Sequence, residues 1–320
     1  MTAKMIGCGS YLPKKILSNS DLEKMVETSD EWIVERTGMR ERRLAAKGEF
    51  PSTMGLKAAK KALKNAKLKP EDVDLIIVAT MTPDYITPST AALIQAELGA
   101  PRAAAVDIQA ACSGYLYALS MAKAHVEAGM ANTVLLIATE KMSAFIDYTD
   151  RNTCVLFGDG ASASLISNRG SGLSINALHL GADGKEADLM KIPAGGSREP
   201  SSCDRYFRMN GREVFKHAVR RMAESAETCL SKASLTTADL KWIVPHQANK
   251  RIMTGLAKKF HFPEEKIYQT LHKYGNTSAS SVAIALDELL DQEPLNPGDN
   301  ILLVTFGVGL TWGAALLSAE

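Results

Sequence analysis

Residues 107–119 read DIQAACSGYLYAL and decide the fold, because they join a buried strand to an apolar helix through a sharp Ala-Cys-Ser-Gly turn. The apolar spacing of SGYLYALSMAKAHVEAG predicts a helix that starts at this turn, and residues 132–139, NTVLLIAT, predict the next strand. Strands that alternate with helices indicate an α/β protein in which helices cover the faces of a sheet.

The same order of elements occurs again in the second part of the chain. Residues 276–292 predict a helix, and residues 299–305 predict the strand DNILLVT. A Gly-rich turn and a closing strand follow in both parts, as FGDGASASLIS at 157–167 and as FGVGLTWGAALLS at 306–318. Because short Gly turns join neighbouring strands, we expect the last two strands of each part to be antiparallel.

These matches predict a duplicated chain of two similar α/β halves that pack together. The halves meet where the sequence NRGSGLS interrupts the pattern. We expect an N-terminal half over 1–172 that carries Cys112, and a C-terminal half over 173–320 that carries His246 and Asn276. Chance similarity between ordinary βα units is the alternative.

Composition excludes several classes of protein. The 320 residues carry 37 Lys and Arg against 36 Asp and Glu, so a broadly basic nucleic-acid footprint is excluded, and 46% hydrophobic residues exclude a disordered chain. The five cysteines form no CxxC pair and are odd in number, which indicates a reducing, cytoplasmic environment. The uncharged stretch 301–319 contains three glycines and predicts two buried strands around a turn rather than a membrane span.

Cys112 is the first candidate for chemistry, because it lies at the predicted junction of strand and helix. The free N–H groups and the dipole of a helix start favour a thiolate over a thiol, and they can hold a developing oxyanion. A small cysteine buried in the core is the alternative at this position.

His246 and Asn276 are the second and third candidates. His246 ends the buried run WIVPH, and sites gather at strand ends in α/β sheets. Asn276 is expected to occupy, in the second half, the position that Cys112 occupies in the first, and its amide donates two hydrogen bonds without titrating. A loop histidine and a helix-capping asparagine are the alternatives.

The turn FGVGLTWG at 306–313 is the fourth candidate. Its glycines predict a backbone that passes close to a partner, where N–H groups can complete an oxyanion hole, and a tight strand turn is the alternative. Cysteine, histidine and asparagine at helix starts and strand ends together indicate covalent acyl transfer through a thioester.

Eight motifs make the whole chain similar to the 3-oxoacyl-[acyl-carrier-protein] synthase III family. They read TSDEWIVERTGMRERR (28–43), ATMTPD (79–84), DIQAACSGYLYAL (107–119), FGDGA (157–161), MNGREVFKHAV (209–219), PHQAN (245–249), YGNTSAS (274–280) and FGVGLTWGA (306–314). Each motif alone is weak, and the set is highly specific. The resemblance implies a thiolase-like fold, with two duplicated α/β halves in a five-layer arrangement.

The resemblance also implies an acyltransferase that starts type II fatty-acid biosynthesis by a decarboxylative Claisen condensation. Cys112 would take an acetyl or somewhat longer or branched acyl group from an acyl-CoA. His246 and Asn276 would then bind the thioester of malonyl carrier protein as it loses CO₂, giving a 3-oxoacyl carrier protein. The oxyanion hole and wall of the site would be formed by Val308, Phe306, Gly307 and Gly309.

Binding residues follow from the same resemblance. The residues implied for CoA are Thr28, Trp32, Arg36, Arg151, Gly211, Phe215, Ala248, Asn249 and Ile252. Those implied for the carrier protein are Gln247, Arg251, Lys216 and Lys258. Those implied for the primer pocket are Thr87, which would reach it across a dimer interface, and Met209. An exposed loop is the alternative for Trp32 and Arg36, and a solvated helix face is the alternative for the basic residues.

Two positions depart from the family pattern. Val308 stands where the terminal loop of the family often has the middle of three glycines, so the backbone donor is kept although the glycine is not. Thr87 stands where many relatives have phenylalanine, and its smaller side chain predicts a longer or wider primer pocket.

The resemblance further implies a homodimeric, multifunctional enzyme of lipid metabolism that acts on acyl-CoA and acyl carrier protein. It implies no metal and no cofactor beyond these substrates, and no nucleic-acid or membrane partner. Two alternatives remain open at this point. One is a related Cys-His-Asn condensing enzyme that makes a secondary metabolite or ketone, and the other is a cysteine hydrolase that passes the acyl group to water.

Overall fold

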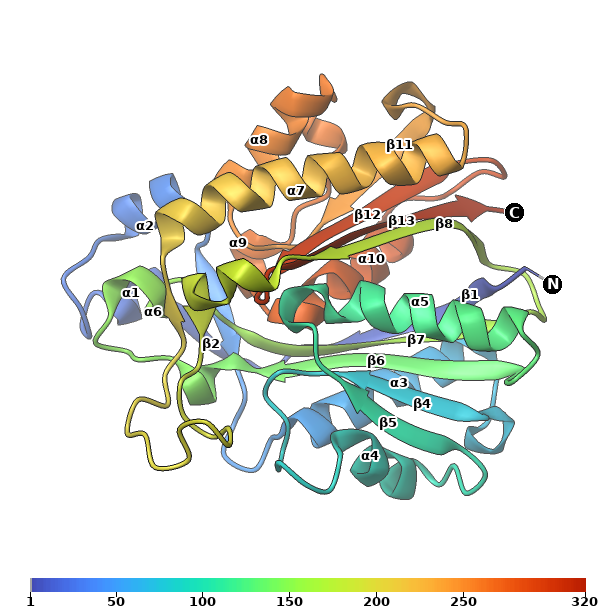
Figure 1. Cartoon of the computed structure of the whole chain (residues 1–320), viewed down its shortest axis with the longest axis horizontal. Coiled ribbons are helices and arrows are strands. Elements are labelled where there is room, and N and C mark those ends of the chain that lie inside the picture. The colour runs from blue at the N-terminus through green and yellow to red at the C-terminus, as the bar shows by residue number, and fades with distance from the viewer. Residues whose placement is uncertain (1) are drawn as a thin grey trace.

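Nine strands within the described residues, 2–320, form one hydrogen-bonded sheet in the computed structural model, and this sheet has two halves (Figure 1). The strand order is β1-β7-β6-β4-β5 in the first half-sheet and β8-β13-β12-β11 in the second. The two half-sheets join at the starts of β1 and β8, where Met5 pairs with Leu173. The bounds of these strands are β1 Lys4–Tyr11, β4 Leu75–Ala79, β5 Ala104–Ile108, β6 Thr133–Lys141, β7 Asp159–Ser167, β8 Leu173–Ala182, β11 Leu240–Pro245, β12 Asn300–Gly307 and β13 Thr311–Ala319.

The two half-sheets repeat the same pattern of strand directions. β7 is antiparallel to β1 and β6, and β13 is antiparallel to β8 and β12. β4 is parallel to β6, as β11 is to β12. The predicted antiparallel closing pairs are therefore confirmed, as are the two strands predicted in 301–319. No helix within residues 2–320 is long and apolar enough to span a bilayer.

Three buried clusters arrange the helices and half-sheets in five layers. On β4, Ile76 packs with α3 and α4, whereas the next residue, Ile77, packs with α5 and α10. On β12, Leu303 faces α5 and α10, and Leu302 faces α7 and α8. This alternation follows from the two-residue period of a strand that is covered on both faces. The expected five-layer α/β arrangement is confirmed. The bounds of these helices are α3 Pro51–Ala66, α4 Thr90–Leu98, α5 Gly114–Glu127, α7 Gly211–Lys232, α8 Lys250–Phe260 and α10 Ser281–Gln292.

The central layer of α5 and α10 lies between the two half-sheets and packs against both. Both helices bury small side chains, including Ala118 and Ala122 on α5 and Ala283 and Ala285 on α10. Small side chains let elements pack closely, so the turns that precede α5 and α10 meet at one end of this layer. The predicted reactive residues lie on or beside these turns.

The remaining segments gather at that same end of the molecule. In Figure 1, α1, α2, α6 and β2 lie together on the left. β2 pairs with β3, and β9 pairs with β10. The bounds of these short elements are β2 Lys15–Ser18, α1 Asn19–Leu22, α2 Asp30–Thr37, β3 Glu41–Leu44, α6 Arg151–Cys154, β9 Met190–Lys191, β10 Arg208–Met209 and α9 Leu271–Tyr274.

Candidate active site

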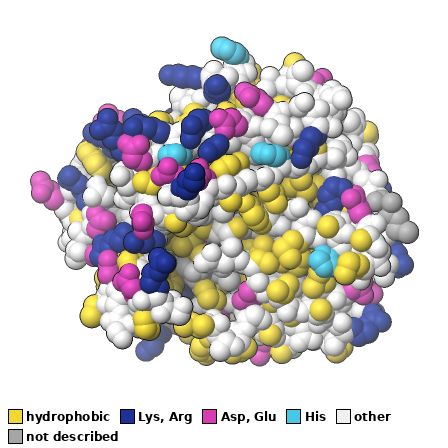
Figure 2. All heavy atoms as spheres, in the orientation of Figure 1, with side chains coloured by type: hydrophobic (Ala, Val, Ile, Leu, Met, Phe, Trp, Pro, Cys, Tyr) yellow, Lys and Arg dark blue, Asp and Glu magenta, His cyan; other side chains and the backbone are white. Residues whose placement is uncertain are grey.

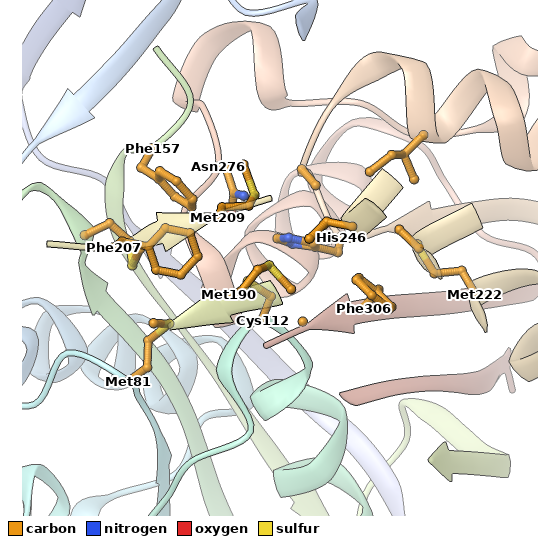
Figure 3. A pocket seen from close by; sticks show the side chains of 16 residues that line it. Met81, Cys112, Phe157, Met190, Phe207, Met209, Met222, His246, Asn276 and Phe306 are labelled. Carbon is orange, nitrogen blue, oxygen red and sulfur yellow. The ribbon is translucent and has the colours of Figure 1, made fainter. Parts of the chain in front are cut away.

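One cavity brings together the three polar residues that the sequence predicts (Figure 3). Cys112, His246 and Asn276 all line it. Most of the other side chains in its wall are thioethers and aromatic rings. The methionines are Met81, Met142, Met190, Met209 and Met222, and the phenylalanines are Phe157, Phe207 and Phe306. The site is therefore a largely apolar chamber with a few polar groups.

Cys112 lies in a short 3-10 turn, Ala111–Ser113, directly before α5. The turn is sharp because Ala111 adopts a φ of +45°, in the left-handed region that non-glycine residues rarely enter. Burial raises the pKa of the Cys112 thiol to about 12. Loss of hydration thus favours the thiol of Cys112, in contrast to the thiolate predicted from the helix start.

The turn before α10 repeats this geometry and corrects the predicted position of Asn276. The 3-10 turn Ser278–Ser280 directly precedes α10, and Ser278 has a φ of +53°, as Ala111 has +45° in the first turn. The counterpart of Cys112 is therefore Ala279, and Asn276 lies three residues earlier. The sequence does not reveal which residue aligns with Cys112, because nothing in the polar run NTSASS marks the residue that adopts the left-handed conformation.

Asn276 reaches the cavity from the loop before the turn. Its backbone N–H donates to the carbonyl of Leu156 at 2.8 Å, and its own carbonyl accepts from the N–H of Gly158 at 3.0 Å. The side-chain Oδ1 accepts from the backbone N–H of Ser278 at 2.8 Å. Because the oxygen is engaged in this way, the Nδ2 group remains the donor that can face a ligand.

His246 follows β11 directly, as the sequence predicts, and is buried. Its backbone N–H donates to Val304, and its ring Nδ1 lies 2.6 Å from Oγ of Ser281. Ser281 Oγ also accepts the backbone N–H of Gln247 at 3.3 Å. In the tautomer that accepts the Ser281 hydroxyl at Nδ1, the ring proton is on Nε2. Burial lowers the pKa of His246 to about 3, so the imidazole is neutral near pH 7.

The turn after β12 packs directly on the Cys112 turn. A Cβ built on Gly307 would lie 2.7 Å from the backbone nitrogen of Cys112, so only glycine fits there. Thr311 Oγ1 donates to the carbonyl of Ala110 at 3.0 Å, and Ser113 Oγ donates to the carbonyl of Thr311 at 3.1 Å. Gly309 takes a φ of +139° within the same turn. The predicted close approach of the Gly-rich backbone is confirmed.

The residues implied for the CoA nucleotide lie together at the outer end of the site. Trp32 on α2 is half-buried, and the guanidinium carbons of Arg36 and Arg151 lie 5.7 Å and 5.0 Å from its ring centroid. Thr28 Oγ1 is buried without a hydrogen-bond partner among the described residues. Asn249 Nδ2 donates to the carbonyl of Arg36, which ties the start of α8 to α2.

Other implied residues continue from this end toward the cavity and over the neighbouring surface. Ala248 and Ile252 line the cavity beside His246. Phe215 on α7 is half-buried, and the guanidinium carbon of Arg251 lies 5.5 Å from its ring centroid. Gly211 is exposed at the start of α7.

The residues implied for the carrier protein lie at the surface, with one exception. Lys216, Arg251 and Lys258 are exposed, and Lys216 also pairs with Glu213 at 2.8 Å. Figure 2 shows Lys and Arg side chains gathered toward the left of the viewed face, where Figure 1 places α2 and the start of α7. Their exposed positive charges can attract an acidic partner.

Gln247 is the exception, and its prediction as a carrier-protein contact is wrong. Its side chain is buried. Oε1 accepts the backbone N–H groups of Thr270 and Leu271, and Nε2 donates to the carbonyls of Pro245 and Tyr268. All of its hydrogen-bonding capacity is used inside the protein, so Gln247 fixes the loop that follows β11.

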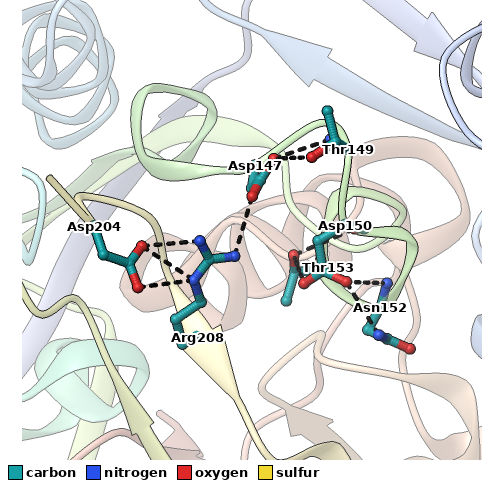
Figure 4. A network of polar contacts seen from close by, with 7 residues as sticks. All are labelled: Asp147, Thr149, Asp150, Asn152, Thr153, Asp204 and Arg208. Atoms are coloured by element: carbon teal, nitrogen blue, oxygen red, sulfur yellow. Dashed lines mark hydrogen bonds and ion pairs between the residues drawn. The ribbon is translucent and has the colours of Figure 1, made fainter.

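A polar network joins the nucleotide end of the site to the cavity wall (Figure 4). Arg208 donates to Asp147 at 3.1 Å and to Asp204 at 3.1 Å. Asp150, close to Asp147 in the chain, caps α6, which carries Arg151. Residues 207 and 209, on either side of Arg208, both line the cavity. Met209 lines the cavity, whereas Thr87 is exposed in the loop that precedes α4.

Several residues in or near the cavity were not predicted from the sequence. Met81, Met142, Met190, Met222 and Phe207 come from separate segments whose patterns resemble an ordinary core. Ser278 and Ser281 lie in or beside the motif YGNTSAS, and that motif is the signal that could have found them. Glu140 is the second-last residue of β6, and only its charge, which follows an apolar run, marks it in the sequence.

Solved structures define the class of protein. The crystal structure of 3-oxoacyl-[acyl-carrier-protein] synthase III from Aquifex aeolicus has a TM-score of 0.93 and 47% identity, with 99% of each chain covered. The crystal structure of beta-ketoacyl-[acyl-carrier-protein] synthase III from Thermus thermophilus has a TM-score of 0.94 and 43% identity, again with 99% of each chain covered. With this fold, the chain is an acyltransferase of the thiolase-like condensing enzymes.

Sequence comparison narrows the class to one family. Models described as 3-oxoacyl-[acyl-carrier-protein] synthase III, and as the C-terminal part of that enzyme, match residues 106–184 and 230–319. Beta-ketoacyl-[acyl-carrier-protein] synthase III of Chlamydia caviae is 56% identical over 98% of this chain and 96% of its own length. The chain belongs to the 3-oxoacyl-[acyl-carrier-protein] synthase III family.

The close packing at Gly307 predicts the effect of one added methyl group. In Gly307→Ala the new Cβ would force the turn away from Cys112 N, and we expect the free energy of unfolding to fall by about 1–3 kcal/mol. Acylation of Cys112 should slow as well. Urea unfolding measures the first effect, and mass spectrometry of the acylated protein measures the second. Gly196→Ala is the control, because its Cβ would meet nothing within 4 Å.

The buried neutral imidazole predicts a loss of stability in acid. Because the folded pKa of His246 is about 3 and its ordinary value is 6.5, the unfolded chain binds an extra proton between these values. Unfolding is therefore favoured as the pH falls below 6.5, by up to about 1.4 kcal/mol per pH unit from this group. Urea unfolding at pH 7 and pH 5 should show a smaller difference for His246→Gln than for the unmodified chain. An equal change in the free energy of unfolding between pH 7 and pH 5 in the two proteins would contradict the lowered pKa of His246.

Proposed function

We propose that Cys112 accepts an acyl group from an acyl-CoA primer and that the same cavity then condenses it with malonyl carrier protein. The observation that carries this proposal is the meeting of Cys112, His246 and Asn276 in one apolar cavity. In the first step the sulfur attacks the thioester carbonyl, and CoA leaves. The N–H groups of Cys112 and Val308 stabilise the oxyanion, and each such donor is typically worth about 3 kcal/mol.

The second step forms the new carbon–carbon bond. Nε2–H of His246 and Nδ2–H of Asn276 donate to the thioester carbonyl of malonyl carrier protein, which stabilises the enolate formed as CO₂ leaves. The apolar wall beside Phe306 favours loss of the carboxylate charge. The enolate carbon attacks the acyl group on Cys112, the carbon–sulfur bond breaks, and 3-oxoacyl carrier protein is released. We infer that side chains and substrates supply this chemistry without a metal or prosthetic group.

Substrate recognition follows the two ends of the site. Trp32 stacks on the adenine of CoA, while Thr28, Arg36 and Arg151 contact the nucleotide. The pantetheine passes the residues Gly211, Phe215, Ala248, Asn249 and Ile252. Arg251, Lys216 and Lys258 attract the acidic carrier protein, which suits a cytoplasmic enzyme of fatty-acid synthesis.

We also propose a homodimer in which Thr87 of the partner subunit closes the primer pocket. β5 is the edge strand of the sheet, so one row of its backbone groups can pair with a second copy. Exposed hydrophobic side chains lie on and near this edge, among them Tyr85, Ile86, Val106 and Met121. Figure 2 shows hydrophobic side chains across the middle of the face that carries α5 and β5.

Product analysis by mass spectrometry tests the proposed reaction. The protein is mixed with malonyl carrier protein and, separately, with acetyl-, butyryl-, isobutyryl- or octanoyl-CoA. We expect 3-oxoacyl carrier protein from the unmodified chain and none from Cys112→Ala. A primer longer or wider than acetyl should react well, because Thr87 is smaller than the phenylalanine of many relatives.

Each other outcome has a defined meaning. Acylated Cys112 without condensation would point to another acceptor or to hydrolysis. The absence of acylation from any CoA would contradict the role of Cys112, and useful rates with acetyl-CoA alone would contradict the inference from Thr87.

The proposed dimer predicts the effect of a charge on β5. In Val106→Asp the new carboxylate would lie in the apolar contact, and burying it without a partner is unfavourable. We expect light scattering to find a dimer for the unmodified chain and a monomer for this variant. Ile16→Asp, on exposed β2, should remain dimeric. A monomer for the unmodified chain would refute the proposal.

A further inference from the structure

Acylation of Cys112 requires a proton acceptor that the proposed mechanism does not provide. In the apolar cavity the sulfur is a thiol, because burial disfavours the thiolate. The proton must leave when the sulfur bonds to carbon. His246 is a poor acceptor, since burial lowers its pKa to about 3.

The contacts of Cys112 point to a different group. Sγ of Cys112 lies 3.5 Å from Oγ of Ser278, which is buried on the turn before α10. The same hydroxyl donates to Oε1 of Glu140 at 3.2 Å. A hydroxyl can accept one proton and donate another at the same time, so these contacts form a continuous path from sulfur to carboxylate.

Glu140 lies at the end of β6 and is fully buried. Its carboxylate also accepts from the hydroxyls of Thr80 at 3.2 Å and Thr82 at 2.5 Å, and from the backbone N–H of Met81. These donors are all neutral. A buried carboxylate held by neutral donors is stabilised less than one in an ion pair, and burial raises the pKa of Glu140 to about 7. The group can therefore gain and release a proton near neutral pH.

We propose that Ser278 and Glu140 form a proton relay that removes the thiol proton of Cys112 during acylation. As the sulfur attacks the acyl-CoA carbonyl, its proton passes to Oγ of Ser278, and the hydroxyl proton of Ser278 passes to Oε1 of Glu140. The bond from the carbonyl carbon to the CoA sulfur then breaks. The proton returns along the relay to the CoA thiolate, so the products are acyl-Cys112, CoA thiol and Glu140 carboxylate.

The relay is separate from the groups assigned to decarboxylation, although both meet at one turn. Ser278 holds Asn276 through its backbone N–H and faces Cys112 through its hydroxyl. Removing the hydroxyl leaves the backbone contact in place. This separation makes acylation and decarboxylation distinguishable, and the inference rests on the proposed role of Cys112 as the acyl acceptor.

Single-turnover acylation tests the relay. Each protein is mixed with acetyl-CoA and quenched at intervals, and the acylated fraction is measured by mass spectrometry. Ser278→Ala and Glu140→Gln should each acylate about a hundredfold more slowly, which is the usual effect of losing general-base assistance. Because the two groups act as a unit, the double variant should be no slower than either single variant.

Matched variants separate the hydroxyl from its backbone and its packing. Ser278→Gly also removes the hydroxyl, while it suits the φ of +53°, and it should acylate as slowly as Ser278→Ala. Ser280→Ala removes a hydroxyl from the same turn that bonds only to the carbonyl of Thr277 among the described residues, and it should acylate at the unmodified rate.

Decarboxylation provides the second readout. Cys112→Ala and Cys112→Ala/Ser278→Ala should release CO₂ from malonyl carrier protein at equal rates, since no thiol proton is involved. Equal loss of acylation and decarboxylation would indicate a structural role and overturn the relay, as would normal acylation by Ser278→Ala. If the unmodified chain is not acylated on Cys112, the proposed function fails with the relay. Normal acylation in the variants would refute the relay alone.

Discussion

The contact between the backbone of Gly307 and that of Cys112 is the constraint on which the site depends. It joins the turn after β12 to the turn before α5, and these turns come from distant parts of the chain. Hydrogen bonds from Thr311 and Ser113 close the contact on both sides. The backbone of the turn that carries Cys112 is therefore packed directly against the backbone at Gly307. This packing leaves the turn little freedom to move. Small side chains on α5 and α10 make this approach possible.

Burial sets the chemistry of the groups that this contact assembles. The same loss of hydration keeps Cys112 as a thiol, keeps His246 neutral and raises the pKa of Glu140. A neutral imidazole is a hydrogen-bond donor rather than a charge, and it therefore suits stabilisation of an enolate. The cavity favours reactions in which charge is lost, and each proton that moves within it requires a nearby partner.

The sequence predicts the layered fold well, because buried strands, amphipathic helices and Gly turns leave regular patterns. The sequence also identifies Cys112, His246 and Asn276 as candidates, and all three line one cavity in the structure. It fails where the outcome depends on three-dimensional packing. Gln247 looks like a surface residue in PHQAN, yet backbone groups of neighbouring loops take up its whole side chain. The pKa of Cys112 and the register of Asn276 follow from burial and from one left-handed residue, and neither leaves a pattern in the sequence.

The methionines of the cavity wall have a consequence for selectivity. A methionine side chain is unbranched and adapts its shape at small cost, whereas a ring or a β-branched chain does not. A wall that contains Met81, Met142 and Met190 can therefore yield to one more methylene group on the guest instead of colliding with it. The free energy of binding in this cavity should therefore change gradually, rather than abruptly, as an apolar ligand becomes longer by one methylene group.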